Sequence, residues 1–154
     1  MTLSNLADLK GGLAPGKRLL GLDVGTKTIG LALSDEGRLI ASPYATIRRG
    51  RFAKDAAELA RVIAREGVGG LVIGLPLNMN GSEGPRCQSV RAFQRNLDKQ
   101  LDLPMAFWDE RLSTAAATQT LLEADASRQR RAEVDDKLAA AYILQGALDR
   151  LRQL

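Results

Sequence analysis

The chain has 154 residues, with 22 basic against 18 acidic side chains and a net charge of +4. This length suits one domain with a substantial core, and the charge is only a mild bias toward anionic partners. One cysteine and no histidine exclude an intramolecular disulfide, a thiolate zinc cluster and imidazole catalysis. Any metal must therefore have oxygen ligands, which favours magnesium or manganese (Mg2+ or Mn2+).

The N-terminal segment, residues 1–17, combines a weak amphipathic pattern with Gly11-Gly12 and Pro15-Gly16. We expect a mobile leader here, followed by a single domain over residues 18–154. The segment lacks the basic start and apolar centre of a signal peptide. No apolar run in the chain reaches the roughly 20 residues that span a bilayer. We therefore expect a cytoplasmic protein.

Three extended runs open the domain, at Leu19–Val24, Thr28–Ser34 and Arg38–Ile47. Short turns join them, which predicts antiparallel neighbours. Gly25 stands at the first turn, where we expect a positive φ. The first run ends on Asp23, a carboxylate in apolar surroundings. Either Asp23 simply begins the turn, or it belongs to a site that offsets the cost of its desolvation.

The pattern then changes to a helical period over Arg51–Glu66, which Gly67 ends. An apolar strand at Leu71–Ile73 follows, and its continuous hydrophobicity predicts a central position parallel to the first strand. The later elements predicted from the sequence are a helix that buries Val90, Phe93, Leu97 and Leu101, a strand at Met105–Trp108, a helix over 113–123, a flexible loop over 124–131 and a helix over 134–152. This order predicts an α/β fold with a five-stranded mixed sheet, three antiparallel strands followed by two parallel to the first, and helices on both faces.

Three acids could meet at one edge of this sheet. Asp23 and Glu110 each follow a predicted strand, and ligands gather at the carboxyl ends of parallel strands. Asp136 opens the apolar stripe of the last helix, which would point it toward the sheet. Its alternative role is a first-turn acid that complements the helix dipole, a role that suits the neighbouring Asp135 better.

Three converging carboxylates would repel one another without cations between them. Divalent ions would relieve this repulsion, and two of them could activate a water and neutralise the leaving oxygen of a phosphodiester. The residues by themselves therefore predict metal-dependent nuclease chemistry.

Four segments in order carry a resemblance: LLGLDVGTKTIGLALSD, VIGLPLNMNGSEGP, DERLST and VDDKLAAAYILQ. Together they resemble the motifs of the YqgF/RuvX family, over about Arg18–Leu148. The resemblance implies a ribonuclease H-like fold and a nuclease that processes the 5′ end of pre-16S rRNA in ribosome biogenesis. It also implies that the catalytic and metal-binding triad is Asp23, Glu110 and Asp136. The alternative activity that it implies is a Holliday junction resolvase acting on four-way DNA.

The same segments supply candidate nucleic-acid contacts: Thr26, Lys27, Asn78, Arg86, Arg111, Arg128, Arg130 and Arg131. Thr26 and Lys27 could equally form a plain hairpin loop, and the three arginines of residues 128–131 could be a solvated charge run. Arg111 could orient Glu110 or bind phosphate.

Two further classes of protein share features with this chain. The DVGTKTIG segment also resembles the phosphate loop of actin-like ATPases and sugar kinases, but those proteins enclose the nucleotide between two such domains. A non-catalytic RNA-binding module would keep the fold, although its three acids would weaken binding to a polyanion unless metal is present. We expect structured RNA as the partner, with branched DNA and ribosomal precursor particles as alternatives. The sequence leaves open whether the protein is a monomer or a homodimer.

Overall fold

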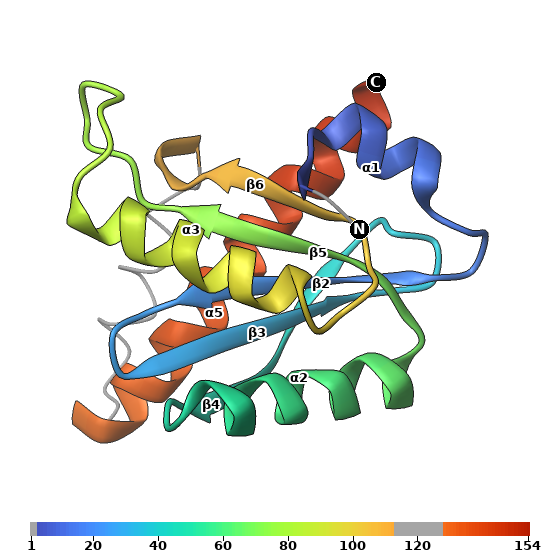
Figure 1. Ribbon diagram of the computed structural model, residues 1–154. Coiled ribbons are helices and arrows are strands. Elements are labelled where there is room, and N and C mark those ends of the chain that lie inside the picture. Colours follow the sequence, from blue (N-terminus) through green and yellow to red (C-terminus); the bar gives the residue numbers. More distant parts are fainter. Residues whose placement is uncertain (1–2, 113–127) are drawn as a thin grey trace.

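The computed structural model describes residues 3–112 and 128–154, with side chains described from residue 5 and, in the last helix, from residue 136 (Figure 1). The strands are β1 (Leu3–Ser4), β2 (Arg18–Val24), β3 (Thr28–Ser34), β4 (Ala41–Arg48), β5 (Val68–Leu75) and β6 (Met105–Asp109). The helices are α1 (Leu6–Gly12), α2 (Phe52–Glu66), α3 (Pro85–Asp98), the 3-10 turn η1 (Glu110–Leu112) and α5 (Arg128–Gln153).

The strands form one sheet in the order β1-β6-β5-β2-β3-β4. β2, β3 and β4 are antiparallel neighbours, whereas β5 and β6 run parallel to β2. The predicted arrangement of three antiparallel strands and two parallel ones is thereby confirmed. The two-residue strand β1 adds a sixth strand at the β6 edge, in parallel pairing.

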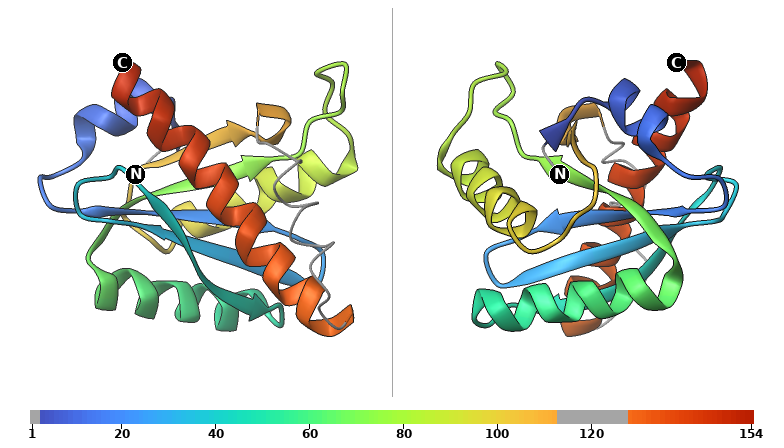
Figure 2. Two further views of the ribbon diagram at one scale, coloured as in Figure 1. Left: turned by 180° about the vertical axis from the view of Figure 1, so that it is seen from behind. Right: turned by 45° about the vertical axis from the view of Figure 1, so that its right-hand side comes forward.

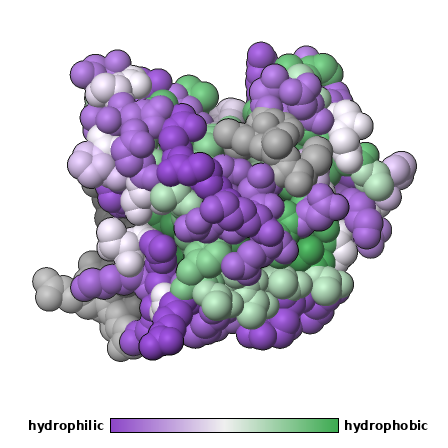
Figure 3. Space-filling view, in the orientation of Figure 1, coloured by the Kyte–Doolittle hydropathy of each residue, from purple (hydrophilic) through white to green (hydrophobic). Residues whose placement is uncertain are grey.

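Helices cover both faces of the sheet, as predicted (Figure 2). α2 and α3 pack on one face over apolar residues such as Leu22, Leu31 and Ile73. α5 crosses the other face, where it buries Leu19 and Val72 together with its own Ala140, Ile143, Leu144 and Ala147. Polar side chains cover most of the outer surface that α3 presents, which agrees with its single buried stripe (Figure 3). Among the described helices, none is long and apolar enough to cross a membrane.

Glycines let α5 lie unusually close to the sheet. A Cβ added to Gly21 would stand 2.7 Å from the Cβ of Leu144, and one added to Gly30 would stand 2.1 Å from the Asp136 carbonyl oxygen. A side chain cannot occupy either position, because neither the Leu144 Cβ nor the Asp136 carbonyl oxygen can move away by a rotamer change. The sheet therefore sets where the beginning of α5, and Asp136 with it, must lie.

Two predictions differ from the structure. In place of a leader, residues 3–12 form β1 and α1, and Leu9 of α1 is fully buried against the α5 side of the core. Lys10 also donates to the carbonyl oxygens of Leu151 and Leu154, so the weak amphipathic pattern reflects a short helix that covers the end of α5.

The second difference concerns the predicted loop over 124–131. α5 begins at Arg128, so this prediction was wrong for its last four residues. Their run of arginine and glutamine is compatible with a helix, since both residue types are good helix formers. The predicted helix over 113–123, and residues 124–127, lie outside the described residues.

Candidate functional site

Asp23 lies in the middle of a row of residues that crosses the sheet on the face covered by α5. Asp23 is paired with Gly30 of β3, and the residue before it, Leu22, is paired with Ile73 of β5. The row therefore runs across the sheet through Thr46, Gly30, Asp23, Gly74 and Trp108. Neighbouring strands are about 4.8 Å apart, so residues above Gly30 and Gly74 lie on either side of the Asp23 carboxylate.

Glu110 occupies the position above Gly74. A Cβ on Gly74 would stand 2.5 Å from the Ile143 Cδ1 and 3.0 Å from the Glu110 Cγ, so the absent side chain leaves room both for α5 and for this carboxylate. Burial raises the pKa of Glu110 to about 7, and the charge of Asp23 adds to this increase. Asp109 raises the pKa further, whereas the Arg86 guanidinium lowers it. Asp23 and Glu110 are thus a pair of neighbouring acids, as the sequence predicted for the two strand ends.

Asp136 occupies the corresponding position above Gly30, on the other side of Asp23. Its backbone contacts β3 where Gly30 has no side chain, and its carboxylate Oδ2 accepts a 2.7 Å hydrogen bond from the Thr28 hydroxyl. Asp23 thus lies in this row, the Glu110 side chain lies over Gly74 and the Asp136 backbone lies over Gly30; we call this arrangement the acid row. Within the described part of the chain, however, no three of the acidic or cysteine side chains are close enough together to hold a single ion.

The turn between β2 and β3 carries Thr26 and Lys27 at an exposed tip. Gly25 N–H donates to the Thr28 carbonyl, and Arg49 donates to the Gly25 carbonyl at 2.7 Å. The expected positive φ at Gly25 was wrong, since this residue is absent from the positive-φ glycines of the described chain. A Cβ there would approach the Thr28 carbonyl oxygen to 3.0 Å, so a close backbone approach is what favours glycine.

Arg86 borders the acids from the start of α3. Its guanidinium donates to the Val24 carbonyl at 3.1 Å, directly after Asp23 in the chain, and its charge acts on Glu110. The structure therefore places Arg86 against the acid row, where it also ties α3 to the end of β2.

The side chains of Asn78 and Arg111 contact residues other than the three candidate acids. The Asn78 amide donates to Ser82 Oγ at 3.0 Å and closes its own loop. Arg111 forms an ion pair with Asp109 at 2.7 Å and donates to the Met79 carbonyl, so it anchors that loop to η1. The alternative in which Arg111 orients Glu110 was wrong, because the Arg111 guanidinium pairs with Asp109 instead of with the adjacent Glu110.

The side chains of Arg128, Arg130 and Arg131 lie outside the described residues. Other contributors to the site escaped the sequence analysis, above all Thr28, Gly30 and Gly74. The sequence signal for the two glycines was their place within otherwise apolar strands, which typically marks the close approach of another backbone, whereas Thr28 had no such signal.

The part of the chain that carries these residues also matches a known protein family. Residues 17–150 match the model of the RuvX family, described as a Holliday junction resolvase. A protein of Paramagnetospirillum magneticum is 64% identical over 143 residues, covering 93% of this chain and 92% of its own length. A protein of Ruegeria pomeroyi is 54% identical over 154 residues, covering all of both chains. Both relatives bear the name "Putative pre-16S rRNA nuclease".

Solved structures share the fold at much lower identity. The RuvC structure of Thermus thermophilus aligns with a TM-score of 0.56 at 13% identity, covering 88% of this chain and 97% of RuvC. The yeast mitochondrial Holliday junction resolvase Ydc2 aligns with a TM-score of 0.50 at 11% identity, covering 96% of this chain and 84% of the resolvase. These likenesses confirm the predicted ribonuclease H-like fold.

Proposed function

Because this chain belongs to the RuvX family, we propose that it is a nuclease that hydrolyses phosphodiester bonds with divalent metal ions held by Asp23, Glu110 and Asp136. The observation that carries the proposal is the acid row. On one face of the sheet, Asp23 lies on β2, the Glu110 side chain lies over Gly74 and the Asp136 backbone lies over Gly30, where neither glycine has a side chain in the way.

The donor set fits a hard divalent cation such as Mg2+ or Mn2+. Its candidate ligands are carboxylate oxygens, the chain contains no histidine, and the one cysteine is buried. A cation between Asp23 and Glu110 would also offset the repulsion that raises the pKa of Glu110. Asp23, Glu110 and Asp136 would hold two such ions, since no three of the described acidic side chains are close enough together to hold a single one. When bound, such ions lower the pKa of the attacking water and neutralise charge on the leaving oxygen.

The neighbouring residues orient this machinery. Thr28 holds the Asp136 carboxylate by its 2.7 Å hydrogen bond. Arg86 favours the ionised form of Glu110, which a metal ligand requires. Thr26 and Lys27 stand at the exposed tip beside the row, where they would contact the substrate backbone.

The remaining candidate contacts lie farther along the chain. Asn78 shapes the loop that borders the site, and Arg111 anchors that loop. The basic segment at the start of α5, with Arg128, Arg130 and Arg131, supplies further charge for a polyanion. We assign all of these to the binding of the nucleic acid outside the acid row.

Structured RNA, at the 5′ end of pre-16S rRNA, is the substrate we favour. Relatives up to 64% identical over nearly the whole chain carry the name of such a nuclease. The alternative, resolution of four-way DNA junctions, has the support of the family description and of resolvases at 11–13% identity. The high identity of the first group is the stronger argument, and it also makes ribosomal precursor particles the partners to test.

The experiment compares a precursor fragment that spans the 5′ end of 16S rRNA with a four-way DNA junction, each with Mg2+ or Mn2+. Asp23→Asn and Glu110→Gln are the test variants, and Glu36→Gln, an exposed acid outside the row, is the matched control. We expect the wild type and the control to cut RNA and both test variants to lose at least about a hundredfold in rate.

Each other outcome decides between the alternatives. Cleavage that survives both substitutions would contradict the assignment of the acids. If the protein cuts the junction symmetrically and leaves the RNA fragment uncut, the resolvase is favoured. A resolvase needs two active sites and hence a dimer, which sedimentation would detect. Binding of RNA without cleavage under either metal would favour the non-catalytic module.

A further inference from the structure

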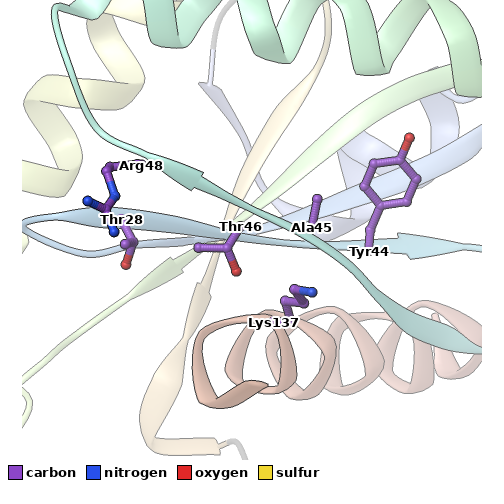
Figure 4. A pocket seen from close by; sticks show the side chains of 6 residues that line it. All are labelled: Thr28, Tyr44, Ala45, Thr46, Arg48 and Lys137. Atoms are coloured by element: carbon purple, nitrogen blue, oxygen red, sulfur yellow. The ribbon is translucent and has the colours of Figure 1, made fainter. Parts of the chain in front are cut away.

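A polar cavity of about 390 Å³ opens between β3, β4 and the described part of α5 (Figure 4). Its lining residues are Thr28, Tyr44, Ala45, Thr46, Arg48 and Lys137. The close view shows Lys137 rising from the helix toward the strands, with Thr46 opposite it and Arg48 beside Thr28. None of these residues was among the sequence-based candidates.

The cavity adjoins the acid row through two of its lining residues. Thr28 lines the cavity, and its hydroxyl donates a hydrogen bond to the Asp136 carboxylate. Thr46 is the end member of the row, paired with Gly30, and stands two strands from Asp23. Two strand spacings amount to about 10 Å, so a nucleic-acid strand whose scissile bond lies over Asp23 can place a neighbouring phosphate in the cavity.

The cavity is lined by two cations, and the carboxylate of Asp136 is bound to the Thr28 hydroxyl at its edge. Neither the Arg48 guanidinium nor the Lys137 ammonium forms an ion pair with another described residue. Other cations of the chain do have acidic partners: Lys54 pairs with Asp55 and Glu58. Two cations in one cavity without a carboxylate partner among the described residues favour an anion as the ligand.

The chemistry of the lining suits a phosphate in particular. Arg48 and Lys137 line the cavity together, and arginine and lysine are residues that nucleic-acid-binding proteins direct at phosphate oxygens. We propose that this cavity binds a backbone phosphodiester of the substrate strand, on the β4 side of the bond cleaved at the acid row. This inference rests on the proposed function, because it assumes a nucleic-acid substrate.

The test measures binding rather than cleavage. Fluorescein-labelled oligouridylate is titrated with protein in EDTA at several salt concentrations between about 50 and 200 mM. The variants are Arg48→Gln, Lys137→Gln and the double variant. Arg61→Gln is the matched control, since Arg61 is exposed on α2, on the opposite face of the sheet. Thermal melts verify that all variants fold.

For single-stranded nucleic acid, each lost phosphate contact lowers the slope of log affinity against log salt by about 0.7. We expect each single variant to weaken binding and to reduce the slope by an amount up to this value. The double variant should lose more than either single variant, and Arg61→Gln should leave the slope unchanged. An unchanged slope in the double variant would overturn the proposal, as would equal losses in the control.

The outcome is separable from that of the proposed function. If the slope falls but the protein never cleaves, the cavity still binds backbone phosphate and the catalytic assignment fails. If the protein cleaves but the slope is unaffected, the cavity assignment fails alone. Inorganic phosphate distinguishes a strand from a free ion: saturable binding of inorganic phosphate that the double variant loses, without any change in the RNA slope, would assign the cavity to the free ion and overturn the proposal.

Discussion

Glu110→Gln should make the metal-free protein more stable at neutral and alkaline pH while abolishing its activity. In the folded protein the pKa of Glu110 is about 7 against an ordinary value of 4.5, chiefly because the carboxyl is buried and faces Asp23. A raised carboxyl pKa means that protonation favours the folded state. The stability contributed by the neutral carboxyl is complete below pH 4.5 and is lost as the pH rises through about 7.

The size of the effect follows from the same values. Above pH 7 the ionised carboxylate costs up to about 3 kcal/mol relative to its unfolded state, and solvent that reaches the half-buried side chain makes this an upper value. Glutamine has nearly the same shape and never ionises. Urea unfolding in EDTA at pH 8 should therefore show Glu110→Gln to be more stable than the wild type by about 2 kcal/mol, with the difference shrinking below about 1 kcal/mol at pH 5.

A control variant and a measurement with Mg2+ accompany the comparison. Glu36→Gln changes an exposed acid outside the row and should alter stability by no more than about 0.5 kcal/mol at either pH. Adding Mg2+ should raise the stability of the wild type at pH 8 and have little effect on Glu110→Gln. A variant that is less stable than the wild type at pH 8, or a stability difference independent of pH, would refute the account of Glu110.

Two further predictions address the elements that position the acids. Gly30→Ala would push a Cβ into the Asp136 carbonyl, so it should cost about 3 kcal/mol in urea unfolding and most of the nuclease rate, whereas Gly11→Ala, which meets nothing within 4 Å, should be neutral or slightly stabilising. Arg86→Gln removes a cation that lowers the pKa of Glu110, so the acidic limb of the pH–rate profile should move to higher pH; an unmoved limb would assign Arg86 to tying α3 to β2 alone.

The sequence predicted the acids of the site better than their arrangement. Asp23 stood out because it ends an apolar strand, Glu110 because it follows a strand, and Asp136 because it opens an apolar stripe. These signals are local, since each needs only the period of its own element. The sequence did not reveal that the three acids form a row rather than a cluster, because that depends on the register between strands and on the path of α5.

The errors have the same origin. Residues 3–12 look weakly structured because their apolar positions are few. They become a strand and a helix through contacts with β6 and α5, which are distant in the chain: Leu3 pairs with Met105, and Lys10 donates to Leu151. Adjacency in sequence made Glu110 one of two possible partners of Arg111, with phosphate as the other, yet the guanidinium reaches back to Asp109. Neighbours in sequence do not reveal which way a side chain points at the end of a strand.

The sequence alone therefore predicted the α/β class, the order and direction of the five main strands, the candidate acids and the family. A hydrophobic period, a turn or a sequence motif predicts each of these features, and all three kinds of pattern can be recognised from residues close together in the chain. The tertiary structure was needed to show that Gly30 and Gly74 make room for Asp136 and Glu110. It was also needed to show that Thr28 holds Asp136 and that Arg48 and Lys137 line a cavity together with Thr28. Those relations join residues from different strands and a distant helix, and close packing across the sheet brings them together.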